Sequence, residues 1–376
     1  MSPAQISQSM AATPLSDRKT KHREERMKLR NYFAALLVSM AILPGSVRAQ
    51  EVRIDVGDGI TVPLKTEGPL KIAFFSEGAN NSAMQASIDG ATRAATELGW
   101  QIDVFDGKFD AVTQLNQLQN ALTRGYDAWV LKAVEGNTMC EIATKDAPAK
   151  GIVVVISVLS ICGRGANEGE ALWSPGTLAY VGGAETPKAF FQVLDRMGRE
   201  NPGPQKLGVI TGPELNPITK NHEAALRMFE AKYPDVEVVA VARTDYSTPS
   251  ALEKAAPMVQ ANPDITLYYT AFSNLAKGLV PVLEQAGLID KAKIYDNGAT
   301  AWAAGAIMEG AVKLSSANRL GSNAYNAVMA IDRARKGENL PRAIGDLGEP
   351  LVDGTPPTDP YLIDSANVAS YQPEVE

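Results

Sequence analysis

The chain has 376 residues, of which 36 are Lys or Arg and 43 are Asp or Glu, so that its formal net charge is −7. Beyond residue 49 the chain is acidic and has no Lys/Arg-rich patch, so that this part is repelled by nucleic acid and by anionic membranes. With only two histidines and two cysteines, a Cys/His zinc cluster of the usual composition is excluded, and we expect no metal and no cofactor.

The segment 27–49 (MKLRNYFAALLVSMAILPGSVRA) has the pattern of a secretory signal peptide. Lys28 and Arg30 precede an apolar run at 32–43, and Val47-Arg48-Ala49 resembles a small-residue cleavage site. The run is too short for a membrane span, which needs about 20 apolar residues. A buried core helix is the alternative, and the basic flank argues against it.

Cleavage after Ala49 would deliver the mature chain to the periplasm. Its net charge would be −12, because residues 1–49 hold eight of the basic and three of the acidic residues. Gln50 rather than Cys follows the cleavage position, which argues against a lipid anchor. Translation begins either at Met1, with a long n-region, or at Met27.

The next segment, 51–68, is expected to form a hairpin around Gly57-Asp58-Gly59. From residue 70 onward, short apolar runs alternate with amphipathic helical stretches. The strands that we predict in the first half are 70–76, 101–105, 128–134 and 152–158. The helices between them are marked by Met84, Ile88, Ala91, Ala95 and Leu98, by Leu115, Leu118 and Leu122, and by the stretch 139–149.

The same alternation then restarts. The predicted strands are 178–181, 206–211, 236–241, 265–270 and 293–295, and the predicted helices are 187–199, 217–233, 249–261 and 275–287. Asn-Pro and Tyr-Pro pairs mark several helix ends, since the residue before proline resists helix.

Most of these strands are continuous Val/Ile/Leu runs, which is typical of parallel strands that are covered on both faces. Repeated β-α-β order predicts two doubly wound α/β lobes, joined by a multi-strand hinge. We assign 70–181 with 319–346 to an N-terminal lobe and 182–318 with 347–376 to a C-terminal lobe. Residues 50–69 form an N-terminal extension.

Sequence motifs for catalysis are absent. The chain has no G-x-S-x-G, no G-x-x-x-x-G-K-[ST], no G-x-G-x-x-G after a strand and no H-E-x-x-H. We therefore expect no catalytic residues and no enzyme activity. A secreted carbohydrate-active enzyme with an Asp or Glu pair is the alternative, although no spacing identifies such a pair.

A ligand site is expected beyond the carboxyl ends of the strands, where open parallel sheets bind their ligands. Amides, hydroxyls, a few charges and several aromatic rings follow the strands there, a mixture that suits a sugar or polyol. Taken singly, residues such as Asn81 are better explained as helix caps. Taken together, a ring of such strand ends predicts a cleft between the lobes.

Four segments resemble the type I periplasmic sugar-binding proteins, the ribose-binding-like family of ABC transporter receptors. They are IAFFSEGANNSAMQASIDGATRAATELGW, FDAVTQLNQLQNALTRGYDAWVLKAV, PSALEKAAPMVQANPDITLYYTAFSNLAKG and YLIDSANVASY. The resemblance covers about 70–345 and implies two lobes that close on a small ligand.

This resemblance also implies ligand-binding positions. Asn80 and Asn81 match the asparagines of the first turn, and Tyr246 matches a stacking aromatic early in the second lobe. Asn297 matches a polar position after a strand, and Asn318 matches a late amide.

Three departures from the family pattern concern the ligand. Val158-Leu159 replaces an Asp-Arg pair that clamps a sugar diol, Thr219 stands at an arginine position, and Phe272 stands at an asparagine position. Because a bidentate arginine is a strong and directional contact, the ligand need not be a simple pentose or hexose.

The remaining candidate residues lie at strand ends: Glu77, Lys132, Ser157 and Arg319, with Phe272 included from the second lobe. Glu77 and Lys132 are expected to pair with each other or to bind the ligand. A solvated rim is the alternative for both.

Cys140 and Cys162 lie near one edge of the first predicted sheet. In an exported protein they are expected to form a disulfide, with two buried free thiols as the alternative.

Taken together, these features predict a monomeric, periplasmic solute-binding component of an ABC importer. It would capture a small polar ligand by hinge closure and present it to a permease in the inner membrane. A periplasmic sensor subunit that signals to a membrane kinase is an alternative with the same fold.

Overall fold

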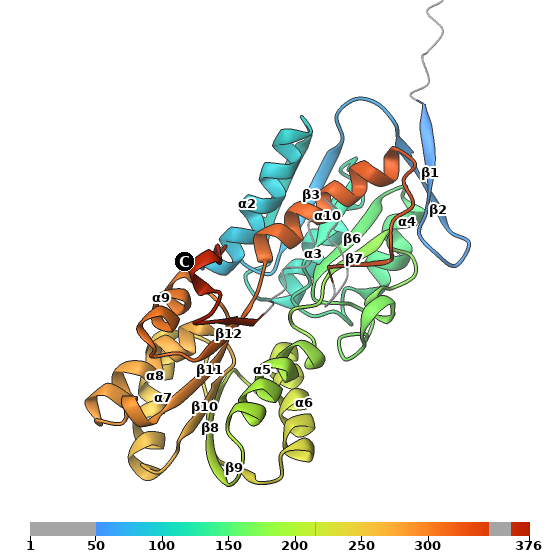
Figure 1. Ribbon diagram of the computed structural model, residues 1–376. Coiled ribbons are helices and arrows are strands. Elements are labelled where there is room, and N and C mark those ends of the chain that lie inside the picture. Colours follow the sequence, from blue (N-terminus) through green and yellow to red (C-terminus); the bar gives the residue numbers. More distant parts are fainter. Residues whose placement is uncertain (1–49, 215, 346–361) are drawn as a thin grey trace, which may run out of the picture. The chain divides into compact units, whose positions relative to one another are not determined.

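The first of two six-stranded sheets is parallel throughout and has the strand order β13-β7-β6-β5-β3-β4 (Figure 1). This computed structural model describes residues 50–214, 216–345 and 362–376. The strands are β3 (Lys71–Ser76), β4 (Gln101–Asp106), β5 (Ala128–Leu131), β6 (Val153–Val158), β7 (Ala179–Gly182) and β13 (Ala343–Ile344). Every residue of β5, β6 and β7 is buried, as their continuous apolar sequences require of strands with two covered faces.

Helices cover both faces of this first sheet, and together they form the first lobe. One face packs against α2 (Ser82–Glu97) and α10 (Leu320–Arg335). The other packs against α3 (Ala111–Ala121) and the short helical segments Ile142–Asp146 and α4 (Ala147–Ala149). Apolar side chains that alternate along each strand fill the two separate cores.

The second sheet has the order β14-β12-β11-β10-β8-β9 and is parallel except for β14. Its strands are β8 (Gln205–Thr211), β9 (Val236–Arg243), β10 (Leu267–Thr270), β11 (Lys293–Gly298), β12 (Leu314–Ala317) and β14 (Leu362–Asp364). One face is covered by α5 (Pro187–Glu200) and α6 (Pro217–Lys232), and the other by α7 (Thr248–Ala261), α8 (Ser273–Gln285) and α9 (Ala301–Glu309). This sheet and its helices form the second lobe.

An N-terminal hairpin pairs β1 (Glu51–Asp55) antiparallel with β2 (Thr61–Lys65). Its inward side chains, which include Ile54, Val62 and Leu64, join the core of the first lobe on the face of α2 and α10. The tight connection at 57–59 needs three consecutive positive φ angles, which its two glycines adopt without steric cost.

Two described segments carry the chain between the lobes. The first, 183–186, runs from β7 into α5, and the second, 318–319, runs from β12 into α10. The third passage, from β13 to β14, includes residues 346–361, which lie outside the described ranges. Asn318 Nδ2 donates to Glu185 Oε1 at 2.8 Å, so that the two described segments are in direct contact.

The predicted fold class of two parallel α/β lobes is confirmed. Two predicted elements differ in detail. The strand expected at 128–134 ends at Leu131, and the helix expected at 139–149 runs from 140 to 149 with a π-helical stretch at Ile142–Asp146. Pro148, just after this stretch, has no amide hydrogen for an α-helical bond to residue 144.

The predicted signal peptide lies outside the described residues, and the predicted lobe boundaries stay a prediction. Among the helices of the described ranges, none has the length and apolar character of a membrane span.

Candidate functional site

A buried ion pair lies where two neighbouring strands of the first sheet end. Lys132 follows β5 and Glu77 follows β3, and Lys132 Nζ lies 2.9 Å from Glu77 Oε2. The two side chains are only 2% and 8% exposed. Lys132 Nζ also contacts Met84 Sδ at 3.4 Å. The pairing that we predicted is therefore present, and the alternative of a solvated rim is wrong for both residues.

A second carboxylate, that of Glu185, lies in the same electrostatic environment. Burial raises the pKa of Glu185, the Lys132 ammonium opposes this rise, and the Glu77 carboxylate adds to it. Glu185 is 6% exposed and accepts a hydrogen bond from Asn318 Nδ2. The site therefore combines strand ends of the first lobe with both described segments between the lobes.

Tyr246 brings the second lobe to this cluster. Burial raises the pKa of Tyr246 to about 12, and the Glu185 carboxylate contributes to the rise. The tyrosine hydroxyl lies 2.6 Å from Thr219 Oγ1, and its ring centroid lies 5.5 Å from that of the half-buried Phe272. Tyr246 has a positive φ of 65°, and a strained backbone of this kind persists only where its surroundings enforce it.

Several buried polar atoms near the ends of these strands have no hydrogen-bond partner among the described residues. They are Ser157 Oγ, Glu185 Oε2, Thr211 Oγ1, Asn318 Oδ1 and Arg319 Nε. Leaving a buried donor or acceptor unsatisfied costs about 1–3 kcal/mol for each group. A polar molecule that supplies these partners would recover that cost on binding.

Asn297 is committed to its own lobe. Its Nδ2 donates to Tyr269 Oη at 3.0 Å and to the Thr270 carbonyl at 3.1 Å, and its Oδ1 accepts from Ser316 Oγ at 2.9 Å. These bonds connect the carboxyl ends of β10, β11 and β12. Asn297 therefore holds these strand ends together. A contact between Asn297 and a ligand stays a prediction.

The two turn asparagines are exposed. Asn81 caps α2 by accepting a hydrogen bond from the Met84 amide at 2.9 Å, and Asn80 is the exposed residue before it. The cap explains Asn81 without any ligand. Of the ten predicted positions, the structure thus gathers Glu77, Lys132, Tyr246 and Asn318 around Glu185.

Glu185 is the residue that sequence reasoning missed. It immediately precedes Thr186, the N-cap of α5, and an acidic residue at that position is ordinarily read as part of a helix start. Only its hydrogen bond with Asn318 and the electrostatic influence of Lys132 distinguish it. Its position just after the predicted lobe boundary between residues 181 and 182 is the one signal that the sequence offered.

The buried His222 belongs to the core of the second lobe. Its ring stacks on Phe190 at a centroid distance of 3.5 Å, and Nδ1 lies 2.7 Å from Tyr269 Oη. Burial lowers the pKa of His222 to about 3, so that the ring is neutral at physiological pH. Among the described residues, no group of three or more His, Cys, Asp and Glu side chains is placed to hold a metal ion.

A groove of about 220 Å³ lies between α6 and β9, with His222, Thr211 and Arg243 among its lining residues. Its walls include neither Glu77 nor Lys132. Of the residues with unpartnered atoms named above, only Thr211 lines this groove.

Asp296 links the ends of three strands of the second sheet. Its carboxylate accepts hydrogen bonds from Thr270 Oγ1 at 2.9 Å, Ser273 Oγ at 2.6 Å and Ser315 Oγ at 2.9 Å. Burial nevertheless raises the pKa of Asp296 from 3.8 to about 7. Between pH 3.8 and about pH 7, the Asp296 carboxyl has lost its proton in the unfolded chain but keeps it in the folded chain. The contribution of this residue to the free energy of unfolding therefore falls as the pH rises.

We expect Asp296→Asn to flatten the pH dependence of stability. Between pH 4 and pH 7, the difference in unfolding free energy between wild type and variant should shift in favour of the variant, as measured by urea unfolding at each pH. The readout is the slope of the unfolding free energy against pH. The free energy at a single pH is not a clean measure, because the substitution also rearranges three hydroxyl hydrogen bonds. Parallel wild-type and variant curves would contradict the assignment.

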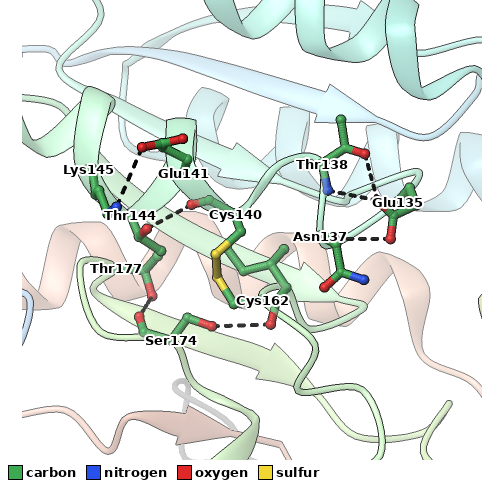
Figure 2. The surroundings of a disulfide bond; sticks show 11 residues. Glu135, Asn137, Thr138, Cys140, Glu141, Thr144, Lys145, Cys162, Ser174 and Thr177 are labelled. Carbon is green, nitrogen blue, oxygen red and sulfur yellow. Dashed lines mark hydrogen bonds and ion pairs between the residues drawn. A yellow bond between two sulfur atoms is a disulfide. The ribbon is translucent and has the colours of Figure 1, made fainter.

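Cys140 and Cys162 are joined by a disulfide, with a Cα–Cα distance of 4.9 Å. Figure 2 shows that the bond connects the segment before Ile142–Asp146 to the loop after β6. This loop begins immediately after Ser157 and Val158, where the resemblance predicts an Asp-Arg pair that this chain lacks. The bond therefore restrains the loop that follows Ser157, one of the predicted site residues.

Comparison with known proteins agrees with this architecture. A family model described as "periplasmic binding protein domain" matches residues 72–339. An ABC transporter solute-binding protein from Mycobacterium smegmatis, solved with bound glycerol, is 20% identical with a TM-score of 0.65, over 82% of this chain and 99% of that one.

Two further structures have a similar fold. The Caulobacter myo-inositol binding protein is 16% identical with a TM-score of 0.67, over 81% of this chain and 96% of that one. A periplasmic ribose ABC transporter protein from Conexibacter woesei is 16% identical with a TM-score of 0.64, over 81% and 94% of the two chains. Since the family model spans well over half of the residues, and the two parallel α/β lobes match these structures, the chain belongs to the type I periplasmic binding proteins.

Proposed function

We propose that the protein captures a small polyhydroxylated ligand in the periplasm and delivers it to an ABC permease in the inner membrane. The observation that carries this proposal is the cluster of Glu77, Lys132 and Glu185, which is buried and borders polar atoms without partners. The similar proteins named above were solved with glycerol or myo-inositol or are named for ribose, which supports a sugar or polyol as the ligand class.

The proposed mechanism is hinge closure. Ligand groups would contact Lys132 and Ser157 from the first lobe, Tyr246 from the second, and Glu185 and Asn318 from the segments between them. A closed form is favoured because only it offers both sets of contacts at once. The closed protein would then present both lobes to the permease as a monomer, without chemical change to the ligand.

A thermal-shift screen of sugars, polyols and cyclitols against the mature chain, 50–376, tests the proposal. A true ligand raises the unfolding temperature, because it stabilises the folded state by RT ln(1 + c/Kd), a term that increases with the free ligand concentration c. Recovery of unaltered ligand after incubation would separate a binding protein from a carbohydrate-active enzyme. Failure of every polyhydroxylated compound to stabilise the protein would contradict the proposed ligand class.

We expect Tyr246→Ala to weaken binding of such a ligand about tenfold, because an aromatic face against the CH groups of a sugar contributes roughly 1 kcal/mol or more. Tyr246→Phe is the matched control, since it keeps the ring and removes only the hydroxyl bonded to Thr219. Isothermal titration calorimetry measures both. Equal dissociation constants for the alanine variant and wild type would remove Tyr246 from the site.

A further inference from the structure

The buried charges at the candidate site do not balance. Among the residues that the structure describes, the cluster contains two carboxylates, Glu77 and Glu185, and one ammonium, Lys132. Lys132 forms its close ion pair with Glu77, which leaves Glu185 without a cation in contact. A buried carboxylate is retained at such a cost only where something compensates for it.

The other titratable groups nearby leave this imbalance in place. Tyr246, whose pKa is raised to about 12, is uncharged at physiological pH. The Arg319 guanidinium instead influences Tyr371 in the C-terminal tail: it lowers the pKa of Tyr371, and the Glu374 carboxylate raises it. Arg319 is not among the charges that shift the pKa of Glu185. Among the described residues, only the Lys132 ammonium and the Asn318 amide favour the ionised form of Glu185, and a proton or a bound cation would complete the compensation.

The unpartnered atoms at Glu185 and Asn318 are acceptors. Asn318 Nδ2 already donates to Glu185 Oε1 at 2.8 Å, while Glu185 Oε2 and Asn318 Oδ1 have no donor among the described residues. A ligand that satisfies both must donate two hydrogen bonds, and a single cationic group that does so also supplies the missing positive charge. A hydroxyl has one proton to donate, whereas an ammonium group has three.

Resting on the function proposed above, we infer that the ligand is an aminated polyol whose protonated amine binds between Glu185 and Asn318. Its hydroxyl groups would then lie toward Ser157 Oγ, which lacks a partner, and toward Lys132. An ammonium against Glu185 forms a charge-assisted hydrogen bond, which is stronger than a bond between neutral groups. It also brings the buried charges into balance.

Proton linkage provides a signature for this arrangement. Burial raises the pKa of Glu185, and a bound ammonium lowers it again, because an opposite charge favours the ionised carboxylate. In the pH range where the free Glu185 carboxyl still holds its proton, binding of an amine should therefore release protons, and the affinity should increase with pH until the amine itself loses its proton. A neutral polyol has no charge that would produce either effect.

The experiment compares matched pairs on the mature chain: D-glucosamine with D-glucose, D-galactosamine with D-galactose, and an aminocyclitol with myo-inositol. Calorimetry in buffers of different ionisation enthalpy gives both the dissociation constant and the protons released. We expect the aminated member of at least one pair to bind tenfold or more tightly, with proton release. Glu185→Gln should lose this preference, because it keeps an oxygen for Asn318 and removes the charge.

Glu168→Gln is the control, since Glu168 forms an exposed ion pair with Lys188 and should leave the preference unchanged. Tighter or equal binding of the neutral members would overturn the inference and leave the proposed function in place. A preference that survives Glu185→Gln would overturn it as well. Binding of neither class would contradict the proposed function too. The wild-type comparison and its proton release decide the question even if the Glu185 variant does not fold.

Discussion

Replacement of Lys132 by methionine should weaken ligand binding by roughly 30-fold or more and lower the free energy of unfolding by about 3–5 kcal/mol. The ammonium is 2.9 Å from Glu77 and also favours the ionised form of Glu185. Methionine has a similar length and no charge, so it leaves two buried carboxylates without a counter-ion. Removing one partner of a buried pair costs more than the pair contributes, because the remaining charge stays desolvated.

Urea unfolding and calorimetry measure the two effects, with Lys145→Met as the control. Lys145 pairs with Glu141 at 3.5 Å, and both side chains are more than 70% exposed, so that its loss should change stability by less than about 1 kcal/mol. Adding Glu77→Gln to Lys132→Met should restore part of the stability without restoring binding. Wild-type stability in Lys132→Met would mean that the cluster is already neutral without the lysine.

The layers of the fold could be predicted because local sequence determines them. The run VVVISV of β6 is buried at every position, and only a strand covered on both faces accommodates such a sequence. The ends of α5 and α6 follow from their Thr186 and Asn216 caps, each followed by proline. The π-helical stretch Ile142–Asp146 within the predicted helix 139–149 could not be predicted, because apolar periodicity does not distinguish π-helical from α-helical turns.

The candidate site was only partly predictable. The rule that ligands bind at the carboxyl ends of strands identified Glu77 and Lys132, and the structure shows that they pair. It did not identify Glu185, because the role of this residue depends on Asn318, which is 133 positions away in the sequence. Nor did it show that the Asn297 amide is fully bonded within its own lobe. Hydrogen-bond networks depend on the register of neighbouring strands, which the sequence of one strand does not contain.

Replacing both cysteines by serine should lower the free energy of unfolding by about 3 kcal/mol. The bond between Cys140 and Cys162 spans a sequence separation of 22 residues, and opening a loop of that length increases the entropy of the unfolded chain by about this amount. Urea unfolding of the wild type and of the double variant measures the difference. Reduction with dithiothreitol should destabilise the wild type to the same extent and leave the double variant unchanged.

The same substitution should also weaken ligand binding, because the disulfide restrains the loop beside Ser157. Other contacts also hold this loop: the Cys162 amide donates to the Gly136 carbonyl at 3.2 Å, Ser174 Oγ donates to the Ile161 carbonyl at 3.4 Å, and the Ile161 side chain packs in the core of the first lobe. Val158 and Cys162 both have positive φ angles, of 68° and 59°, a conformation that side chains other than glycine adopt only under restraint. A more mobile loop must be ordered again on binding, at a cost in conformational entropy. If the double variant is less stable but binds its ligand with wild-type affinity, the loop is not part of the site, and the bond serves stability alone.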